Sequence, residues 1–387
     1  MAVPVHPEIR ERVVRLPEGP VTVLQDQDPM MVLVEQRRLV ERANPAFWSP
    51  RWEPLYETLN RSPFPVRPLG GFIPETVERF GQEVPGITYG QVGRREYPPQ
   101  GTRVKRQRDG IWLRLPNGSQ VRGVAYYQVR NLRRTGLDLW ETPPQRRFIA
   151  EGSYNDLPRS RLQAGDIVIV NSGVGSLGRC AVVPADIGLA NISQDIDRIV
   201  VENVTPEWVV VFIQSRYGAG QLERWLAGVS GQVKIDFAEI RALRIPVPAH
   251  KVQTAVAAAY RQMAHYHSQA VAARDRGDET TAARWTSIAL GLLETLILQV
   301  EELIERQRRA ITPLIPTGLP EALQKFLEDE YERIGRLART NGPVRPTEEN
   351  GMRLLGIPSE RLPEVREEAQ RVLRLVDSLR GVKVAAD

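Results

Sequence analysis

A long stretch without proline constrains the fold of this chain more than any other feature of its sequence. Residues 249–312 contain none of the 30 prolines of the 387-residue sequence and are rich in Ala, Leu, Gln and Arg. Gly277-Asp278 interrupts the stretch, so the pattern predicts two long helices, 249–275 and 279–311. Along the second helix, large apolar residues recur every three or four positions and predict a helix interface: Trp285, Ile288, Leu292, Leu296, Val300 and Leu303.

This apolar stripe needs a covering surface, because burying one Leu or Ile side chain is favourable by roughly 1.5–3 kcal/mol. On a lone helical hairpin, Ile288, Leu296 and Ile297 are expected to stay partly exposed. The cover is a second copy of the chain, a partner protein, or the chain's own amphipathic segments at 321–340 and 360–381. The sequence leaves these three possibilities open.

The residues before the helices are typical of short strands and turns. Residues 111–115 and 120–128 flank an Asn-Gly pair at 117–118, which predicts a β-hairpin. Residues 166–170 and 179–183 are short apolar runs on either side of a glycine-rich loop. A helix is expected to begin at Pro206 and to run to about Tyr217.

The positive charge of the chain is concentrated in one segment. Residues 94–147 hold 13 Lys and Arg against four acidic residues, a local net charge of +9, whereas the whole chain carries +5. A run of charge is often only a solvated surface. Here large aromatic residues and strand-like residues alternate with the charges, and this favours contact with nucleic acid.

The glycine-rich loop matches the spacing of a dinucleotide-binding motif through Gly173, Gly175 and Gly178. Such a site needs the loop to open a helix, whose N-terminal N–H groups bind the pyrophosphate. Residues 179–184 are β-branched and end in proline, so they predict a second strand. The loop is therefore expected to join two strands without binding a cofactor.

Several other functions lack the residues that they need. One cysteine, Cys180, excludes a disulfide framework, and four histidines make a histidine metal site or a catalytic base improbable. We expect no catalytic residue, no metal and no cofactor in this chain. The longest apolar runs fall far short of the ~20 residues of a membrane helix, and a secretory signal pattern is missing, so a cytoplasmic location is expected.

Taken together, residues 44 to about 310 resemble the target-recognition domain of type I restriction–modification specificity subunits. The glycine loop and its preceding strand, at 162–179, carry the strongest similarity. The other segments follow in the family's order: Asn44-Pro-Ala-Phe-Trp-Ser-Pro50, Gly86-Ile-Thr-Tyr-Gly90, Val124-Ala-Tyr-Tyr-Gln-Val-Arg-Asn-Leu132 closed by Gly136, and the run from Ile240 to Gln253. Residues 103–122 look inserted relative to that family.

The resemblance implies an α+β fold in which a domain of short twisted strands and small helices docks on a long helical hairpin, followed by a helical C-terminal region. The boundaries are an N-terminal extension at 1–43, a recognition domain at 44–248, a spacer or dimerisation hairpin at 249–312 and the C-terminal region at 313–387. Only one recognition domain and one spacer are seen, whereas the family's subunits hold two of each.

The resemblance also implies a function without catalysis. The chain would recognise a sequence in double-stranded DNA for an adenine methyltransferase subunit, which would bring S-adenosylmethionine, in a restriction–modification or related anti-phage defence system. A nuclease or translocase subunit is a further expected partner, and a second copy of the chain would supply the missing recognition domain.

Candidate DNA contacts follow from side-chain chemistry. Arg, Asn and Gln offer two hydrogen bonds to a base edge, whereas clustered cations position the phosphate backbone. The base-reading candidates are Gln128, Arg130, Asn131, Arg133, Arg134 and Asn171. The phosphate candidates are Arg103, Lys105, Arg106, Arg108, Arg146, Arg147, Arg179 and Lys234.

Two alternatives compete with this interpretation. The chain is a truncated recognition half of a methyltransferase–nuclease fusion enzyme, or it is a helical interaction scaffold without specific DNA binding. A methylation assay of the purified chain discriminates the first, and binding to duplex DNA at low salt discriminates the second.

Overall fold

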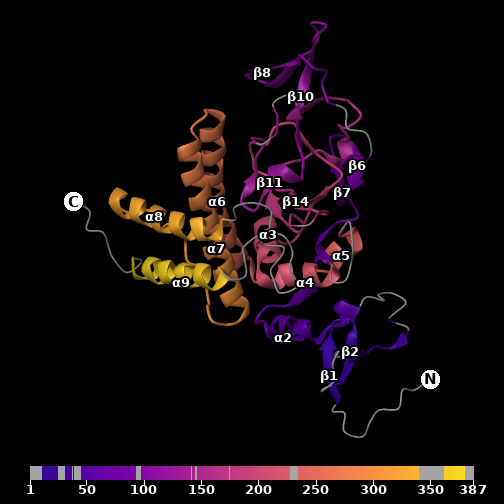
Figure 1. Cartoon of the computed structure of the whole chain (residues 1–387), viewed down its shortest axis with the longest axis vertical. Helices are drawn as coiled ribbons and strands as arrows, with labels where there is room; N and C mark the ends of the chain where they lie inside the picture. Colours follow the sequence, from indigo (N-terminus) through magenta and orange to yellow (C-terminus); the bar gives the residue numbers. More distant parts are fainter. Residues whose placement is uncertain are drawn as a thin grey trace.

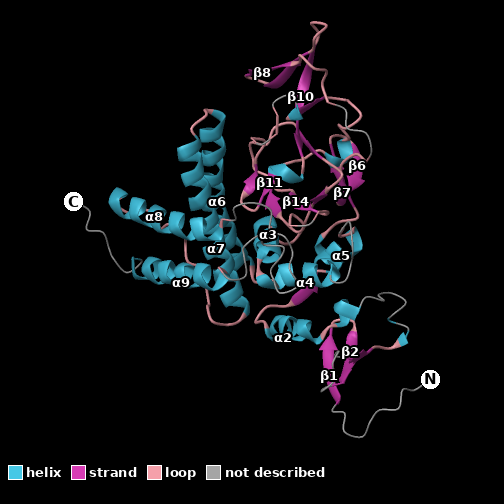
Figure 2. Ribbon diagram, viewed as in Figure 1, coloured by secondary structure: helices cyan, strands magenta, loops and turns pink. Residues whose placement is uncertain are grey.

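The computed structural model describes residues 11–24, 31–36, 38, 45–92, 97–140, 142–143, 146–173, 175–226, 234–339 and 361–379. Long helices gather on one side of the molecule and most strands on the other, with a small N-terminal sheet at one end (Figures 1 and 2). The expected α+β class is confirmed. Asn44, the first residue of the aromatic segment quoted above, lies outside the described residues.

The proline-free stretch forms the predicted helical hairpin of α6 (His250–Asp275) and α7 (Glu279–Ile304). The turn between them contains Gly277 in the left-handed region at φ +78°, and the Asp278 carboxylate accepts a hydrogen bond from the Thr281 N–H at 3.0 Å. The second helix ends earlier than the expected residue 311, because the backbone leaves the helical conformation at Arg306, whose φ is +63°.

The chain's own C-terminal helices cover the apolar stripe of α7. These helices are α8 (Glu321–Ala338) and α9 (Leu362–Leu379), and both pack against α7 (Figure 1). Ile288, Leu296 and Ile297, which a lone hairpin would leave partly exposed, are all buried under this cover, so of the three possibilities the chain's own C-terminal segments supply it. Of the six predicted stripe residues, Ile288, Leu292, Leu296, Val300 and Leu303 are buried, and Trp285 is half-buried against the Tyr266 ring.

Two glycines allow α7 and α8 to approach unusually closely. A Cβ atom on Gly291 of α7 would lie 2.0 Å from the Tyr331 carbonyl oxygen, and one on Gly335 of α8 would lie 1.7 Å from the Ser287 carbonyl oxygen. Each glycine thus faces the backbone of the other helix. Any side chain at either position would force the two helices apart.

We therefore predict that Gly335→Ala destabilises the protein by roughly 1–3 kcal/mol, the usual cost of overpacking a tight contact. Chemical denaturation of the two proteins measures this difference. Gly71→Ala is the matched control, because a Cβ atom there would meet nothing within 4 Å. Equal stability of the Gly335→Ala variant and the natural protein would contradict the close crossing.

The strand-rich unit is built from two packed sheets. The first has the order β15-β14-β17-β7 and the second has the order β13-β10-β9-β8, with β16 paired in parallel to β10. The strands of the first sheet are β7 (Ile87–Tyr89), β14 (Ile167–Val170), β15 (Cys180–Val182) and β17 (Ile196–Ile199). Those of the second are β8 (Arg103–Gln107), β9 (Gly110–Arg114), β10 (Gln120–Tyr127), β13 (Phe148–Ala150) and β16 (Ala190–Ile192).

The central strand β14 explains why these layers stay together. All four of its residues are apolar and fully buried. Ile167 and Ile169 belong to the core shared with the helices, whereas Val168 and Val170 belong to the core shared with the second sheet. Because side chains alternate along a strand, one continuous apolar run supplies both faces of the layer.

Three short helices follow the first sheet in the sequence. They are α3 (Pro206–Gln214), α4 (Arg216–Leu226) and α5 (Phe237–Ala242). The first of them, α3, packs between strand β15 and the helical hairpin. The single helix predicted from Pro206 to about Tyr217 is therefore two helices, which break at Ser215. The Glu301 carboxylate of α7 accepts a hydrogen bond from the Arg216 N–H at 2.7 Å, so a group from a distant helix caps the start of α4.

The remaining elements are short, and three of them, β1, β2 and β3, form the N-terminal sheet. The short strands and helices are β1 (Glu11–Leu16), β2 (Gly19–Leu24), β3 (Met31–Leu33), α2 (Glu53–Arg61), β4 (Val66–Pro68), β5 (Thr76–Arg79), β6 (Gln82–Pro85), β11 (Leu132–Arg133), β12 (Gly136–Leu137) and β18 (Arg244–Pro246). The buried Arg224 of α4 lies 3.8 Å from the Phe47 ring and binds Glu18 of the β1–β2 turn. This one side chain links the N-terminal sheet to the strand-rich unit.

Candidate nucleic-acid interface

The basic segment forms an extended antiparallel hairpin at the end of the molecule (Figure 1). Strands β9 and β10 pair as predicted around the Asn-Gly turn, where Gly118 has φ +86° and the Asn117 side chain accepts a hydrogen bond from the Ser119 N–H at 3.0 Å. Strand β8 adds to the outside of β9. Residues 103–122, which look inserted in the sequence, thus extend the second sheet beyond its buried centre.

Strand pairing sorts the side chains of this extension onto two faces. Arg103 lies opposite Arg114, which lies opposite Gln120, and Lys105 lies opposite Trp112. Arg122 of β10 lies opposite Trp112. With Gln107, these residues share one face, which we call the cationic face: Arg103, Lys105, Gln107, Trp112, Arg114, Gln120 and Arg122. Trp112 and Arg122 are half-buried and the other five are exposed, and none of the seven is acidic.

The cationic face is electrostatically unfavourable on its own. Like charges directly across a strand pair are destabilising, and the Arg103–Arg114 pair has that arrangement. The nearby Asp109 carboxylate, which accepts a hydrogen bond from the Trp112 indole N–H at 3.0 Å, supplies one negative charge against the four cations Arg103, Lys105, Arg114 and Arg122. A polyanion placed against this face would remove the repulsion.

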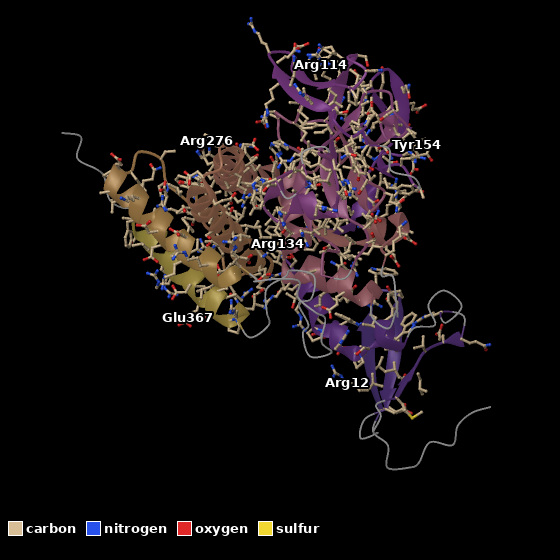
Figure 3. All side chains as sticks on the ribbon, turned by 45° about the horizontal axis from the view of Figure 1, so that its top comes forward. Arg12, Arg114, Arg134, Tyr154, Arg276 and Glu367 are labelled. Atoms are coloured by element: carbon tan, nitrogen blue, oxygen red, sulfur yellow. The ribbon has the colours of Figure 1, made fainter. Side chains whose placement is uncertain are left out.

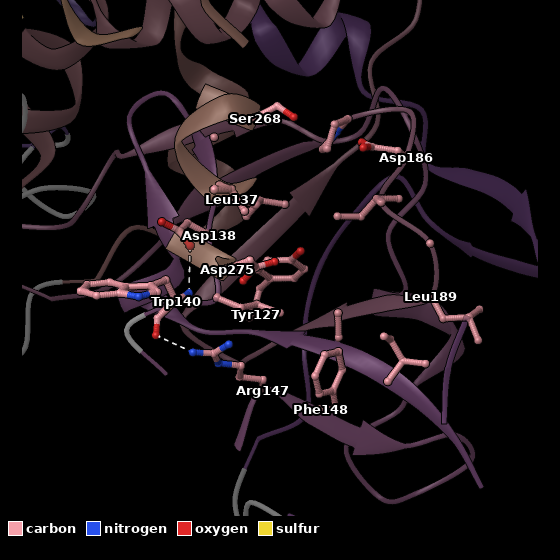
Figure 4. A pocket seen from close by; sticks show the side chains of 18 of the residues that line it. Tyr127, Leu137, Asp138, Trp140, Arg147, Phe148, Asp186, Leu189, Ser268 and Asp275 are labelled. Carbon is pink, nitrogen blue, oxygen red and sulfur yellow. Dashed lines mark hydrogen bonds between the residues drawn. The ribbon is translucent and has the colours of Figure 1, made fainter. Parts of the chain in front are cut away.

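The opposite face of the same sheet turns toward helix α6. Val104 and Ile111 line a cavity of about 860 Å³ between the sheet and α6, together with Tyr127, Leu137 and Phe148 (Figure 4). Apart from Arg122, the cationic-face residues do not line this cavity, in agreement with the alternation of side chains along a strand. The two faces are therefore chemically distinct.

The phosphate candidates divide according to these two faces. Arg103, Lys105 and Arg108 are exposed at the hairpin, as expected for backbone contacts. Arg106 lies on the other face and binds the Asp275 carboxylate of α6 at 3.1 Å. This ion pair places Arg106 between sheet and helix, and because its side chain is largely exposed, the expected phosphate contact stays a proposal.

The phosphate candidates outside the hairpin also divide. Arg146 is exposed, with its guanidinium 5.4 Å from the Tyr97 ring centroid, and Lys234 is exposed 5.3 Å from the Tyr89 ring centroid. Arg147 donates to the carbonyl oxygens of Thr142 and Trp140, as Figure 4 shows in part. Arg179 donates to the Leu132 carbonyl oxygen at 3.0 Å. The last two arginines therefore hold loops of the domain together.

Among the base-reading candidates, Gln128 and Asn131 have structural roles. Both are buried around a short helical turn, where the Asn131 carboxamide accepts from the Gln128 N–H at 3.0 Å and donates to the Thr142 hydroxyl at 2.6 Å. The Gln128 side chain donates to the Tyr97 hydroxyl. These hydrogen bonds replace the base contacts expected from the sequence.

Arg134 and Asn171 are also held inside the protein. The Arg134 guanidinium forms an ion pair with Glu294 of α7 and donates to Gln214, and Figure 3 shows Arg134 where the strands meet the helices. Asn171 is buried and donates to Asp197 at 2.6 Å. Of the six base-reading candidates, only Arg130 is exposed, and Arg133 is half-buried. We retain these two as proposals.

Five further residues complete the cationic face and are not among the candidates named from the sequence: Gln107, Trp112, Arg114, Gln120 and Arg122. Figure 3 shows Arg114 near the end of the extension, far from the C-terminal helices. A signal for these residues was available. The Asn-Gly turn fixes the register of the hairpin, and a period of two from Arg103 groups the residues of β8 onto one face.

The glycine-rich loop joins two antiparallel strands, β14 and β15, which confirms the strand–loop–strand prediction. Its glycines, Gly173, Gly175 and Gly178, all have left-handed φ values between +78° and +100°. In the described part of this loop no helix begins, because Gly178 is followed by Arg179 and then by β15. The N-terminal N–H groups that would bind a pyrophosphate are therefore not present there. Among the described residues, no group of three or more His, Cys, Asp or Glu is arranged to hold a metal ion.

A buried acid lies at the base of this loop. Burial raises the pKa of Asp197 to about 7, although the hydrogen bond from Asn171 and the positive charge of Lys234 act in the opposite direction. Because the unfolded chain releases this proton near pH 4, the native state binds more protons than the unfolded state between pH 4 and 7. The contribution of Asp197 to the free energy of unfolding therefore falls as the pH rises from 4 to 7.

We predict that Asp197→Asn removes this pH dependence. The free energy of unfolding of the natural protein, relative to that of the variant, should fall by roughly 2 to 4 kcal/mol between pH 4.5 and 7.5. Urea unfolding of both proteins at three pH values measures the difference. A difference that is constant with pH would show that Asp197 is already ionised throughout this range.

Comparisons with known proteins give structural similarity only. No protein-family model matches the chain, and no curated protein matches it. Solved structures of type I restriction–modification proteins are similar to it, which agrees with the resemblance seen in the sequence. Among the described residues, no helix is long and apolar enough to cross a membrane.

Three of these structures illustrate the level of similarity. The first is a chain from a study of complex assembly and conformational transition of the type I R-M system, with 16% sequence identity and a TM-score of 0.31. The aligned region covers 67% of the present chain and 54% of the chain from that study. The S subunit from M. genitalium has 10% identity and a TM-score of 0.31, covering 64% and 49%. The HsdS subunit from Thermoanaerobacter tengcongensis has 17% identity and a TM-score of 0.29, covering 70% and 53%.

The chain thus spans about half the length of each of these structures. With TM-scores near 0.3, the superpositions carry no argument about function. The function proposed below therefore rests on the residues of this chain.

Proposed function

We propose that this protein recognises double-stranded DNA and directs a partner methyltransferase to its site. The observation that carries the proposal is the cationic face of the β8–β9–β10 sheet, where like charges face each other across strands and four cations outnumber the one nearby carboxylate, that of Asp109. Arg108, Arg130 and Arg146 are further exposed cations in the described part of the same basic segment. Together these groups form a surface suited to a phosphate backbone.

The partner in this proposal follows from the family resemblance in the sequence. The methyltransferase would bind S-adenosylmethionine and carry out the chemistry, and this chain would contribute recognition without catalysis. A nuclease or translocase subunit and a second copy of the chain are further partners in such an assembly. The α7 stripe is not the contact for a second copy, because α8 and α9 cover it.

The first prediction from this proposal concerns salt. If about five phosphates are contacted, the logarithm of the binding constant for a duplex should fall against the logarithm of salt concentration with a slope of about −4 to −5. Fluorescence anisotropy of a labelled 30-base-pair duplex pool at several salt concentrations measures the slope. A slope near zero, or failure to bind duplex at low salt, would contradict the proposed function and favour a helical scaffold.

The second prediction concerns the partner. The tagged full chain, expressed in its native host, should retain a methyltransferase subunit during affinity purification, and the complex should methylate DNA while the isolated chain does not. Mass spectrometry and a methylation assay on the two samples provide the test. Methylation by the isolated chain would instead support the fusion-enzyme alternative.

A further inference from the structure

The extension formed by β8, β9 and the start of β10 is a narrow antiparallel ribbon. Gln120, Val121 and Arg122 of β10 pair with β9, so the ribbon has three strands at its outer end, where Arg103 lies opposite Arg114. Only the inner end near Gln107 and Gly110, which is directed toward α6, has two strands. Every residue of β8 is exposed. Neighbouring strands lie ≈ 4.7–4.9 Å apart, so the three strands span roughly 10 Å.

The dimensions distinguish between the two grooves. The major groove is about 12 Å wide and can hold a ribbon whose strands span roughly 10 Å, whereas the minor groove is only about 6 Å wide. The five residues of β8 extend over roughly 17 Å, which corresponds to about five base-pair steps along one strand of DNA. A ribbon of this size can lie along the floor of the major groove.

The side chains on the cationic face suit base recognition as well as charge neutralisation. Arginine makes two hydrogen bonds to the O6 and N7 atoms of guanine, and glutamine makes two to the N6 and N7 atoms of adenine. The face holds both types, with Arg103 and Arg114 in one cross-strand row at the outer end and Gln107 toward the inner end. The hydrogen bond from Trp112 to Asp109 fixes the ring between them.

A simpler explanation for such charges is protection of the sheet edge. Lysine and arginine on an edge strand prevent pairing with another chain, and β8 is an edge strand. This explanation covers Arg103 and Lys105 but not Arg114, because Arg114 lies on β9, an inner strand between β8 and β10. The charge extends across the face and not only along the edge.

We propose that the β8–β9 ribbon enters the major groove of duplex DNA with its cationic face toward the bases, and that Arg103, Gln107 and Arg114 read base edges there. This inference rests on the proposed function, and it adds the groove, the element and the reading residues. The opposite face remains turned toward α6, where Arg106 binds Asp275.

A selection of binding sites from a random duplex pool tests the reading residues. Arg114→Ala and Gln107→Ala should each lose preference at one or two positions of the selected site, with a loss of roughly 5- to 150-fold against the preferred base. Arg374→Ala is the matched control, because it removes one exposed arginine from α9 on the opposite side of the molecule. Thermal unfolding of each variant verifies that the fold is intact.

Arg114→Lys separates reading from charge. Lysine keeps the positive charge but not the planar pair of donors, so this variant should retain the salt dependence of binding while losing base preference at the same position. If Arg114→Ala, Arg114→Lys and Gln107→Ala all select the same site as the natural protein, the ribbon does not read bases.

A second experiment identifies the groove. Duplexes carrying glucosylated 5-hydroxymethylcytosine have their major groove obstructed, and distamycin occupies the minor groove of A·T-rich duplexes. Binding should fall at least tenfold on the glucosylated duplex and stay within about twofold in distamycin. The reverse pattern would overturn the ribbon proposal while leaving DNA binding established, whereas failure to bind any duplex would overturn the proposed function as well.

Discussion

Two buried carboxylates on α7, those of Glu294 and Glu301, connect this helix to the strand-rich unit, to the short helices and to α9. Glu294 forms an ion pair with Arg134 from the β11–β12 turn, and Glu301 accepts the Arg216 N–H and pairs with Arg366 of α9. Both carboxylates are buried, and burial raises the pKa of Glu294 while Arg134 acts in the opposite direction. Removing one partner of a buried pair costs roughly 3–5 kcal/mol. One helix therefore fixes the strand-rich unit, the short helices and the C-terminal cover.

A second set of contacts fixes the angle of the sheets against α6. The His267 ring lies between the Thr135 hydroxyl and the Leu137 carbonyl oxygen, and the Tyr260 hydroxyl accepts the Val182 N–H at 3.1 Å. Farther along α6, Asp275 binds Arg106 of the ribbon. The apolar face of the ribbon is thereby held toward the helix, which leaves the cationic face directed outward.

The sequence predicted the elements better than it predicted the partners of individual side chains. The helical hairpin, the Asn-Gly hairpin and the strand–loop–strand at Gly173 are confirmed because each depends on local periodicity or turn chemistry. The sequence leaves open what covers the α7 stripe, because an amphipathic pattern does not identify its partner. It also predicts Asn131 as a base reader, because an asparagine that closes a helical turn and one that contacts DNA look the same in a sequence.

The central claim is that DNA binds on the cationic face and nowhere on the C-terminal helices. Hydrogen–deuterium exchange of the full chain with and without a bound duplex tests it most directly. Duplex should slow amide exchange in peptides that span 103–122, while peptides from α8 and α9 exchange at unchanged rates. Protection confined to α8 and α9, or unchanged exchange across 103–122 with the duplex bound, would contradict the account.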